Sequence, residues 1–365
     1  MKRIDSSSLK DFVRNVFVAS GSSSDEDNRI ATSLVGANLA GHDSHGVARV
    51  PRYVQWKRDG MLTADRKVEV VTDTPVLAVV DGKMGFGQTV GAQAVQLGID
   101  KCKAMGLAAV ALRNSGHLGR IGDWAEMAAK EGLVSLHFVN IVGSVLVAPF
   151  GGVDRRFSTA PVCIGIPRPG QDPVLLDFAT SLVAEGKVLV ASQGGKPLPA
   201  DALIAQDGTK SADPHLLYGD YQGSEPRNYR KGTGAIRAFG EHKGSGLALM
   251  CELLGGALTG NGASTFDRPW SSGMFSFYID PGKLDASAFF PAEVARAVAF
   301  VKSSKPAQAG GEVLVPGEPE QRNRAERLAQ GIPLPDDTWS ALIATARDVG
   351  INALPDEVQA TVARY

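Results

Sequence analysis

Histidine and arginine side chains are concentrated in one segment, Gly41-His-Asp-Ser-His-Gly-Val-Ala-Arg49, which Pro51-Arg-Tyr53 follows. Reduction of a ketone by hydride requires a proton donor at the developing alkoxide, and a histidine with an ordinary pKa of about 6.5 can supply and recover that proton. A 2-oxo acid also requires a cation for its carboxylate, which Arg49 or Arg52 could bind bidentately. The alternative is a plain helix C-terminus, where histidine is favoured and glycine ends the helix.

A second polar segment, Asn114-Ser-Gly-His-Leu-Gly-Arg-Ile-Gly-Asp-Trp124, lies between a predicted strand and a predicted helix. Its glycines allow the backbone to approach a ligand closely, and the helix start presents free N–H groups to a pyrophosphate. His117 lies at the mouth of this loop. In the alternative interpretation Asp123 caps the helix and competes with phosphate for the same amides. We favour ligand binding.

Three further segments have weaker signals. Val174-Leu-Leu-Asp-Phe-Ala-Thr-Ser181 contains one charge, Asp177, which could orient an imidazole, bind a ribose or cap a helix. His242-Lys-Gly-Ser-Gly-Leu247 opens an apolar helix and is a natural anion site. Val315-Pro-Gly-Glu-Pro-Glu-Gln-Arg322 marks a turn before a charged helix, and nothing local assigns it a ligand.

Periodicity predicts the elements that must position these segments. Two helices are expected within residues 6–40, and further helices at 89–104, 123–131, 243–258, 291–303, 319–330 and 337–348. Strands are expected at 68–71, 76–80, 107–113, 133–140, 161–166, 174–178 and 274–280. The helix at 243–258 is strongly apolar and is expected to be central and buried. The Gly- and Pro-rich connection at 194–234 is expected to be a surface loop or a segment that spans between domains.

The order of strand, helix and strand over residues 107–140 is typical of a β-α-β unit in a doubly wound sheet. The glycine fingerprint of such sheets is missing, however. Gly85-Phe-Gly87-Gln-Thr-Val-Gly91 has the wrong third spacing, and no acidic residue ends a second strand as a ribose ligand. The sequence therefore does not support a Rossmann dinucleotide-binding fold.

Composition limits the class of protein. The chain of 365 residues is 44% hydrophobic and 21% charged, as expected for a globular enzyme of about two or three packed units. A net charge of −1 argues against nucleic acid or an anionic membrane as partner. No apolar run reaches roughly 18 residues, and the N-terminus lacks a signal-peptide core, so we expect a cytoplasmic protein. The three cysteines, Cys102, Cys163 and Cys251, are expected to be reduced core residues.

Taken together, these motifs resemble the type-2 malate/L-lactate dehydrogenase family, whose layout fits residues 5–350. The motifs that carry the resemblance are Gly-His-Asp-Ser-His-Gly at 41–46, His-Leu-Gly-Arg-Ile-Gly at 117–122, Leu-Leu-Asp-Phe-Ala-Thr-Ser at 175–181, His-Lys-Gly at 242–244 and Pro-Gly-Glu at 316–318. The resemblance implies a mixed α/β (α+β) fold, with a largely antiparallel nicotinamide-binding sheet and a helical region built from both chain ends. It also implies a homodimer, a small 2-oxo or 2-hydroxy acid as substrate, and NAD or NADP without a metal.

The resemblance further implies the division of the chain and the roles of single residues. A helical dimerisation domain would comprise residues 1–72 with 285–365, and the cofactor and substrate region residues 73–284. His45 would be the acid/base residue, with Ser44 beside it and Asp177 as a candidate relay partner. His117 would lie near the substrate, and Arg49 would bind its carboxylate.

The expected cofactor contacts form several short segments. They are His45, Arg120, Ile121, Gly122, Leu175, Leu176, Asp177, Phe178, Ala179, His242, Lys243, Gly317, Glu318 and Glu320.

Two features depart from the family pattern, and both affect the choice of substrate more than the reaction type. The chain has Thr159-Ala-Pro161 where the family usually has Thr-Asn-Pro, so the asparagine side chain is missing. The segment at about 212–232 is longer than expected.

Three rival functions stay open. A cyclic imine-2-carboxylate reductase of the same family needs similar parts. A metal-dependent hydrolase could use His42, Asp43, His45 and His117 as zinc ligands, but it leaves the glycine-rich anion sites unexplained. A regulatory protein without catalysis would have to treat all five polar motifs as turns.

Overall fold

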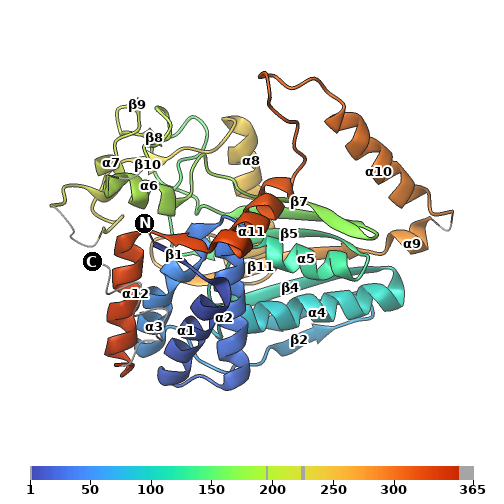
Figure 1. Cartoon of the computed structure of the whole chain (residues 1–365), viewed down its shortest axis with the longest axis horizontal. Helices are drawn as coiled ribbons and strands as arrows, with labels where there is room; N and C mark the ends of the chain where they lie inside the picture. Colours follow the sequence, from blue (N-terminus) through green and yellow to red (C-terminus); the bar gives the residue numbers. More distant parts are fainter. Residues whose placement is uncertain (1, 195, 223–226, 286, 353–365) are drawn as a thin grey trace.

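A seven-stranded mixed sheet forms the centre of the computed structural model, which describes residues 2–194, 196–222, 227–285 and 287–352 (Figure 1). In spatial order the strands are β2 (Glu69–Asp73), β3 (Leu77–Asp81), β4 (Leu107–Ser115), β11 (Ser271–Ile279), β5 (Val134–Val142), β6 (Pro161–Arg168) and β7 (Gln171–Ala179). Neighbouring strands are antiparallel except for the parallel pair β3 and β4. The predicted mixed fold with a largely antiparallel sheet is therefore confirmed.

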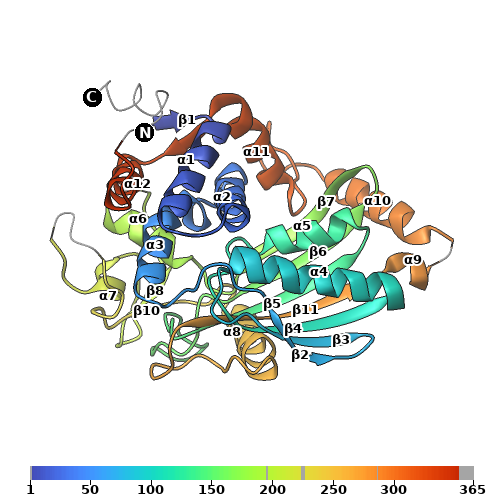
Figure 2. The same ribbon diagram turned by 90° about the horizontal axis from the view of Figure 1, so that it is seen from below.

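Two helices, α4 (Gly87–Met105) and α5 (Gly122–Lys130), cover one face of this sheet (Figure 2). Their inner side chains pack with the strands into a core that includes Val95, Trp124 and Met274. β4, α5 and β5 follow each other as predicted, but β11 lies between the two strands. No Rossmann unit is formed from them, which agrees with the missing fingerprint.

Helices from both ends of the chain build a second core, as the resemblance implied (Figure 2). They are α1 (Ser6–Ala19), α2 (Ser24–Leu39), α3 (Val50–Arg58) and α12 (Asp336–Asp348). β1 (Lys2–Ile4) pairs with β12 (Ile332–Leu334), which follows α11 (Glu318–Gln330). This pairing ties the first residues to the C-terminal helices. The proposed domain boundaries themselves stay a prediction.

The expected connection at 194–234 is more ordered than a surface loop. It contains β8 (Leu203–Ile204), β9 (Lys210–Ser211) and α7 (His215–Tyr218), and β8 also pairs with β10 (Ala235–Ile236). These elements share a small core with α6 (Glu185–Ser192). Residues 195 and 223–226 of the segment lie outside the described residues.

One guanidinium organises this region. Arg155 donates to the carbonyl oxygens of Leu217, Tyr229, Gly232 and Gly234. The backbone of the longer segment is therefore held by hydrogen bonds that sequence periodicity cannot show.

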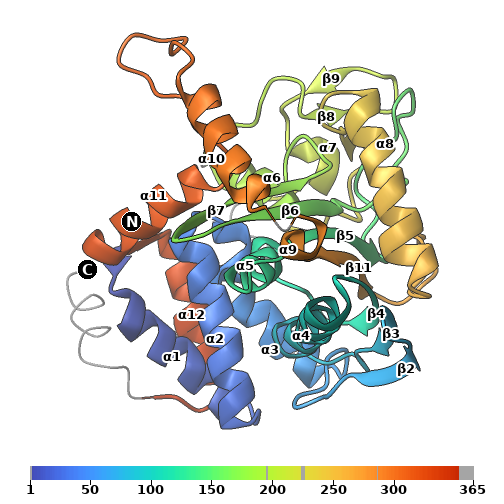
Figure 3. The ribbon, with the colours of Figure 1, turned by 90° about the vertical axis from the view of Figure 1, so that its right-hand side faces the viewer.

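The prediction that helix 243–258 is central and buried is wrong. α8 (His242–Met250) continues as the π-helix η3 (Cys251–Leu258), which packs on β5 and β11 opposite α4 and α5 (Figure 3). Only its inner side is covered. Leu249, Leu253 and Leu258 on the outer side are 43%, 45% and 57% exposed. The apolar composition of a helix predicts that its side chains will be covered. It does not show what covers them.

Two further helices, one short and one long, follow β11. α9 (Pro281–Leu284) leads toward α10 (Phe289–Lys302), which packs beside β6 and has no buried residue. Figures 1 and 3 show α10 projecting from the body of the molecule.

Within the described residues, none of the helices combines the length and the apolar character needed to cross a membrane. Cys102, Cys163 and Cys251 are free and buried, as predicted.

A pair of glycines tests the packing of α4 against the sheet. A Cβ at Gly98 would overlap the ring of the buried Tyr278, whereas a Cβ at Gly36 in α2 would meet nothing within 4 Å. Gly98→Ala should therefore destabilise the fold by about 1–3 kcal/mol through overpacking. Gly36→Ala should be neutral or stabilising by up to about 1 kcal/mol, because alanine favours the helix. Thermal unfolding followed by circular dichroism measures both; equal shifts in Tm would contradict this packing.

Candidate active site

Two glycines shape the turn between α2 and α3. Gly41 has a left-handed backbone with φ of 87°, and a Cβ there would lie 2.5 Å from Asn323 Nδ2. A Cβ at Gly46 would overlap the side chain of Asn38. Close packing therefore requires glycine at both positions, and conformation requires it at the first. Between them, the 3-10 turn η1 (Asp43–His45) carries the predicted acid/base residue.

Asn38 holds this turn from α2. Its Oδ1 accepts from Val47 N at 2.8 Å, and its Nδ2 donates to Asp43 Oδ1 at 2.6 Å. On the other side, Nη1 and Nη2 of Arg327 donate to the two carboxylate oxygens of Asp43 at 2.6 and 3.1 Å. Sequence analysis assigned no role to Asn38 or Arg327, because neither stands in a motif and the second is 284 residues from its partner.

His45 and His117 lie face to face, with ring centroids 5.5 Å apart and an interplanar angle of 11°. His45 Nδ1 is 3.1 Å from Ser44 Oγ. Burial, followed by the charge of Arg49, lowers the pKa of His45 to about 3. Burial and Arg49 also lower the pKa of His117 well below its ordinary value. Both imidazoles are therefore neutral near pH 7.

Tyr53 and Gln88 hold His117. Tyr53 Oη lies 2.6 Å from His117 Nδ1, and Gln88 Nε2 donates to the phenol oxygen at 3.1 Å. Since that oxygen accepts from Gln88, the phenol proton is free to be donated to Nδ1, an arrangement that suits the tautomer with the imidazole proton on Nε2. Sequence analysis missed both residues, although Tyr53 ends the first motif and Gln88 lies within the rejected glycine pattern.

That glycine pattern has a packing role. A Cβ at Gly87 would overlap the carbonyl oxygen of His117, and a Cβ at Gly116 would lie 2.6 Å from Gly85 O. The glycines let the start of α4 pack directly against the loop that carries His117.

Arg49 is the predicted carboxylate-binding cation that lies beside the two histidines. Its Nε donates to Ser44 O at 2.6 Å, and its charge acts on the pKa of both imidazoles. Arg52 is exposed, and its guanidinium lies 5.8 Å from the centre of the Trp56 ring. The structure therefore places Arg49, and not Arg52, beside the two histidines, a choice that the residue types alone left open.

The longer segment at 212–232 contacts the surroundings of Ser44 through Tyr218, which bonds to Glu185 at the start of α6. A Cβ at Gly186 would lie 2.8 Å from Ser44 Cβ, so the start of α6 forms a wall beside Ser44. The preceding residue, Glu185, accepts a hydrogen bond from Tyr218 Oη at 2.6 Å. Burial raises the pKa of Tyr218 above its ordinary value, so this phenol stays protonated.

Ala160, at the position of the missing asparagine, is fully buried where β6 begins. Its carbonyl oxygen accepts from Thr180 N at 2.9 Å and from Thr180 Oγ1 at 2.7 Å. The end of β7 is thus held to this position by main-chain contacts that do not need the asparagine side chain.

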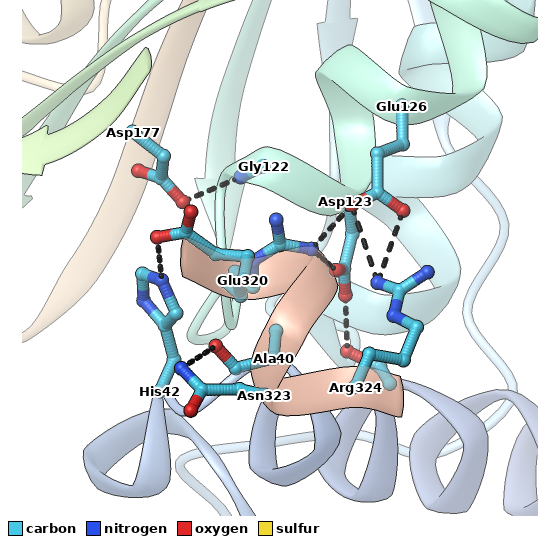
Figure 4. Close-up of polar contacts among 11 residues, drawn as sticks. Ala40, His42, Gly122, Asp123, Glu126, Asp177, Glu320, Asn323 and Arg324 are labelled. Carbon is cyan, nitrogen blue, oxygen red and sulfur yellow. Dashed lines mark hydrogen bonds and ion pairs between the residues drawn. The ribbon is translucent and has the colours of Figure 1, made fainter. Parts of the chain in front are cut away.

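Asp177 lies near the end of β7, as predicted, but its hydrogen bond goes to Gly122. Asp177 Oδ2 accepts from Gly122 N at 2.7 Å, at the first residue of α5 (Figure 4). Burial raises the pKa of Asp177, while the nearby His42 and Arg120 oppose that shift. The described contacts include no hydrogen bond between Asp177 and His45.

Arg120 is 1% exposed, and only part of its guanidinium is hydrogen-bonded to the described residues. Nη1 donates to Asp123 Oδ1 at 3.0 Å and to Glu126 Oε1 at 2.8 Å. Nε and Nη2 make no hydrogen bond within the described part of the chain. Burial disfavours the charge, but the two carboxylates together raise the pKa of Arg120. The side chain therefore stays a cation with unused donors.

The first two turns of α11 join these groups to the turn between α2 and α3, residues 41–47 (Figure 4). His42 Nε2 lies 3.2 Å from Glu320 Oε1, and Arg324 Nη2 donates to Glu126 at 3.3 and 3.4 Å. The contact with His42 lowers the pKa of Glu320. These contacts of Glu320 and Arg324 connect α11 both to the 41–47 turn and to α5.

A cavity of about 180 Å³ lies between α5, β7 and α11. Arg120, Leu175, Gly317, Glu320 and Arg324 are among the residues that line it. Several predicted cofactor contacts therefore meet at one groove, although they come from three distant segments. Of the neighbouring predicted contacts, Leu176 is 38% exposed and Ile121 is buried in the sheet core.

The remaining predicted cofactor residues have other neighbours. The rings of His242 and Phe150 lie 5.8 Å apart, and Lys243 beside His242 is exposed. Glu318 caps its own turn by accepting from Val315 N at 3.0 Å. Phe178 packs edge-on against Phe239, with ring centroids 5.4 Å apart, and Ala179 pairs with Pro161 in the sheet.

The hydrolase alternative receives no support from the geometry. His42 contacts Glu320, Asp43 contacts Arg327, and the other two candidate ligands stack on each other. In the described ranges, no three His, Cys, Asp or Glu side chains are grouped so that they could hold a metal ion.

Comparison with known proteins identifies relatives along nearly the whole chain. The family model described as malate/L-lactate dehydrogenase matches residues 4–343. Hydroxycarboxylate dehydrogenase B of Escherichia coli is 39% identical over 97% of this chain and 96% of its own length. A Δ1-pyrroline-2-carboxylate/Δ1-piperideine-2-carboxylate reductase of Pseudomonas syringae is 34% identical over 89% of this chain and 90% of its own length. The solved malate dehydrogenase of Pyrococcus horikoshii has a TM-score of 0.84 at 29% identity, covering 97% of each chain.

The lowered pKa values of the two histidines can be measured directly. In protein labelled with ¹⁵N-histidine, we expect the rings of His45 and His117 to stay neutral from pH 8 down to pH 5, because burial and Arg49 oppose protonation. Arg49→Met should raise both pKa values, because it removes a neighbouring positive charge. Arg52→Met is the matched control and should leave them unchanged. Protonation of either ring with a midpoint above pH 6 in the unaltered protein would contradict this environment.

Proposed function

Because the chain belongs to the malate/L-lactate dehydrogenase family, we propose that it interconverts small 2-oxo and 2-hydroxy acids by hydride exchange with NADH or NADPH. The observation that carries the proposal is the stacked pair of neutral imidazoles beside Arg49. This arrangement combines a proton acceptor, a second imidazole and a cation for a carboxylate in one place.

His45 handles the proton in this proposal. When bound, the reduced nicotinamide supplies the hydride that forms the new C–H bond at C2 of the oxo acid. His45 delivers one proton to the C2 oxygen, so the ketone gains two electrons and two hydrogens and becomes a secondary alcohol. In the reverse direction neutral His45 accepts the hydroxyl proton. Its low pKa suits this role, because the ring is already unprotonated near pH 7.

Arg49 adjusts that proton affinity when a substrate binds. In the free protein its charge lowers the pKa of both imidazoles. A carboxylate paired with Arg49 cancels this charge and raises the pKa of His45 toward the range in which it can donate a proton. His117, held by Tyr53 and stacked on His45, helps to orient the acid.

The groove between β7 and α11 fits the nucleotide part of the cofactor. The buried Nε and Nη2 of Arg120 are donors without a partner in the described chain, which suits an anionic or carbonyl ligand. Gly317 lines the groove without a side chain. We assign Asp177 to these cofactor contacts instead of the proton path, because its hydrogen bond holds the start of α5.

A cyclic imine-2-carboxylate reductase is the second candidate, and the Pseudomonas syringae relative favours it. Its substrate also bears a carboxylate next to the carbon that receives hydride. Arg49 would serve both substrates, and the reaction would then deliver the proton to nitrogen.

We further propose that a second copy of the chain covers the outer side of α8 and η3. Leu249, Leu253 and Leu258 are all exposed on that side and form an apolar surface. Surfaces of this kind on a globular enzyme are typical of subunit interfaces. The free state of all three cysteines suits the reducing cytoplasm, which we propose as the compartment.

The enzymatic proposal is tested by the absorbance of NADH and NADPH at 340 nm across oxaloacetate, pyruvate, phenylpyruvate and a cyclic imine acid. We expect turnover of at least one oxo acid, and His45→Ala should lower its kcat by more than about a hundredfold without changing Tm. Turnover of the imine alone would select the second candidate. Activity of His45→Ala within tenfold of the parent would remove His45 from the proton path.

The interface proposal is tested by light scattering. The parent should have the mass of two chains, because exposed leucines are covered by the second copy. Leu253→Lys should shift it to one chain, since a buried unpaired charge is costly. Lys187→Glu, an exposed change on α6, is the control and should stay dimeric. A parent of single-chain mass at micromolar concentration would contradict the interface.

A further inference from the structure

α11 begins in the groove at the edge of β7. Leu175 N donates to Pro316 O at 3.0 Å, and a Cβ at Gly317 would lie 3.2 Å from Leu175 N. Gly317 also has a left-handed backbone with φ of 97°. The first turn of α11 is therefore packed against the strand so closely that a ligand on the strand at this point meets the helix as well.

The same helix reaches the turn that carries His45. Glu320, Asn323 and Arg327 are spaced three and four residues apart, so they lie on one face of α11. Glu320 contacts His42 at 3.2 Å, and Asn323 Nδ2 donates to Ala40 O at 3.5 Å. One helix face thus lies along the backbone from the end of α2 into the 41–47 turn.

Arg327 makes the most specific of these contacts. It holds both carboxylate oxygens of Asp43, and its Nη1 also donates to Asn38 O at 2.5 Å. A guanidinium fork fixes the orientation of a carboxylate, which a single point charge does not. Asp43 lies two residues before His45 in the same 3-10 turn, so a contact that holds Asp43 also restrains the backbone that carries the imidazole.

We propose that α11 transmits occupancy of the groove between β7 and α11 to the 41–47 turn, with Arg327 as the positioning residue for His45. The inference rests on the proposed function, because it takes the groove as part of the cofactor site. A helix moves as a rigid rod, and Glu320 and Arg327 are about 10 Å apart along its axis at 1.5 Å per residue. Fixing the first turn of α11 therefore fixes Arg327, and with it Asp43.

The coupling predicts an order of binding. With the groove empty, the turn samples orientations in which His45 does not face the substrate. With the groove filled, the turn is held in one orientation. The acid then binds to a site in which His45 already faces it. Cofactor binding should accordingly raise the affinity for the acid, and by linkage the acid should raise the affinity for the cofactor.

Hydrogen exchange tests the coupling without turnover. Amide exchange of the peptide covering residues 38–50 should slow by about tenfold when NADH or NADPH is added to the full chain at saturating concentration. In Arg327→Met the nucleotide should bind within about threefold of the parent Kd, measured by nucleotide fluorescence, but the slowing should be lost. The matched control is Arg322→Met on the same helix, which removes an exposed ion pair with Glu312, a residue that precedes α11, and should keep the slowing.

Kinetics separate positioning from loss of fold. Arg327→Met should lower kcat by about tenfold to hundredfold, as expected for a misplaced acid/base group, with little change in KM for the nucleotide. Arg327→Lys keeps the charge but not the fork and should recover only part of kcat. In protein that already carries Asp43→Asn, adding Arg327→Met should change kcat little further, because the two residues form one contact.

Three outcomes overturn the proposal in distinguishable ways. Nucleotide binding that leaves exchange of residues 38–50 unchanged in the parent removes the coupling and leaves the proposed function intact. Failure of both nucleotides to bind the parent removes the proposed function and this inference with it. Retention of kcat within twofold in Arg327→Met excludes Arg327 as a positioning residue.

Discussion

The carboxylate of Asp43, held between Asn38 and the guanidinium fork of Arg327, is the interaction on which the candidate site depends. It joins α2 to α11, so the turn that carries His45 is assembled from residues near both ends of the chain. Gly41 and Gly46 allow this, because side chains at either position would overlap Asn323 or Asn38. Without the contact, the turn would keep its glycines but lose the groups that orient it.

Burial and neighbouring charges then determine the protonation state of the side chains in and around the turn. His45 and His117 stack in surroundings that disfavour a second positive charge beside Arg49, so both rings are neutral. Arg120 shows the opposite outcome, because Asp123 and Glu126 keep it charged in spite of burial. The site thus places neutral proton acceptors next to a cation for a carboxylate, and a buried cation with unused donors at the neighbouring groove.

Local sequence patterns were sufficient for the longer elements and for a set of candidate residues. Periodicity predicted the seven strands of the central sheet and most of the longer helices, but not α3, α6, α7 or the short strands β1, β8, β9, β10 and β12. Residue type singled out His45, His117, Arg49 and Arg52 as candidates. It could not place Tyr53, Gln88, Asn38 or Arg327, because their roles arise from contacts between segments that are far apart in the chain.

The error at helix 243–258 has a different origin. Its leucines were expected to be covered, but Leu249, Leu253 and Leu258 lie on the side of the helix that is exposed in the single chain. Hydrophobic patterning does not distinguish burial within a chain from burial against a partner. The missing glycine fingerprint, by contrast, was informative, since β11 between β4 and β5 rules out a Rossmann unit there.

The most direct test follows a deuterium atom. NADH or NADPH deuterated at the transferable C4 position is incubated with the protein and a 2-oxo acid, and the product is analysed by mass spectrometry and NMR. The account predicts a 2-hydroxy acid with one deuterium at C2, formed by the parent and not by His45→Ala. An unlabelled product, or a label at any other carbon, would contradict hydride transfer at this site.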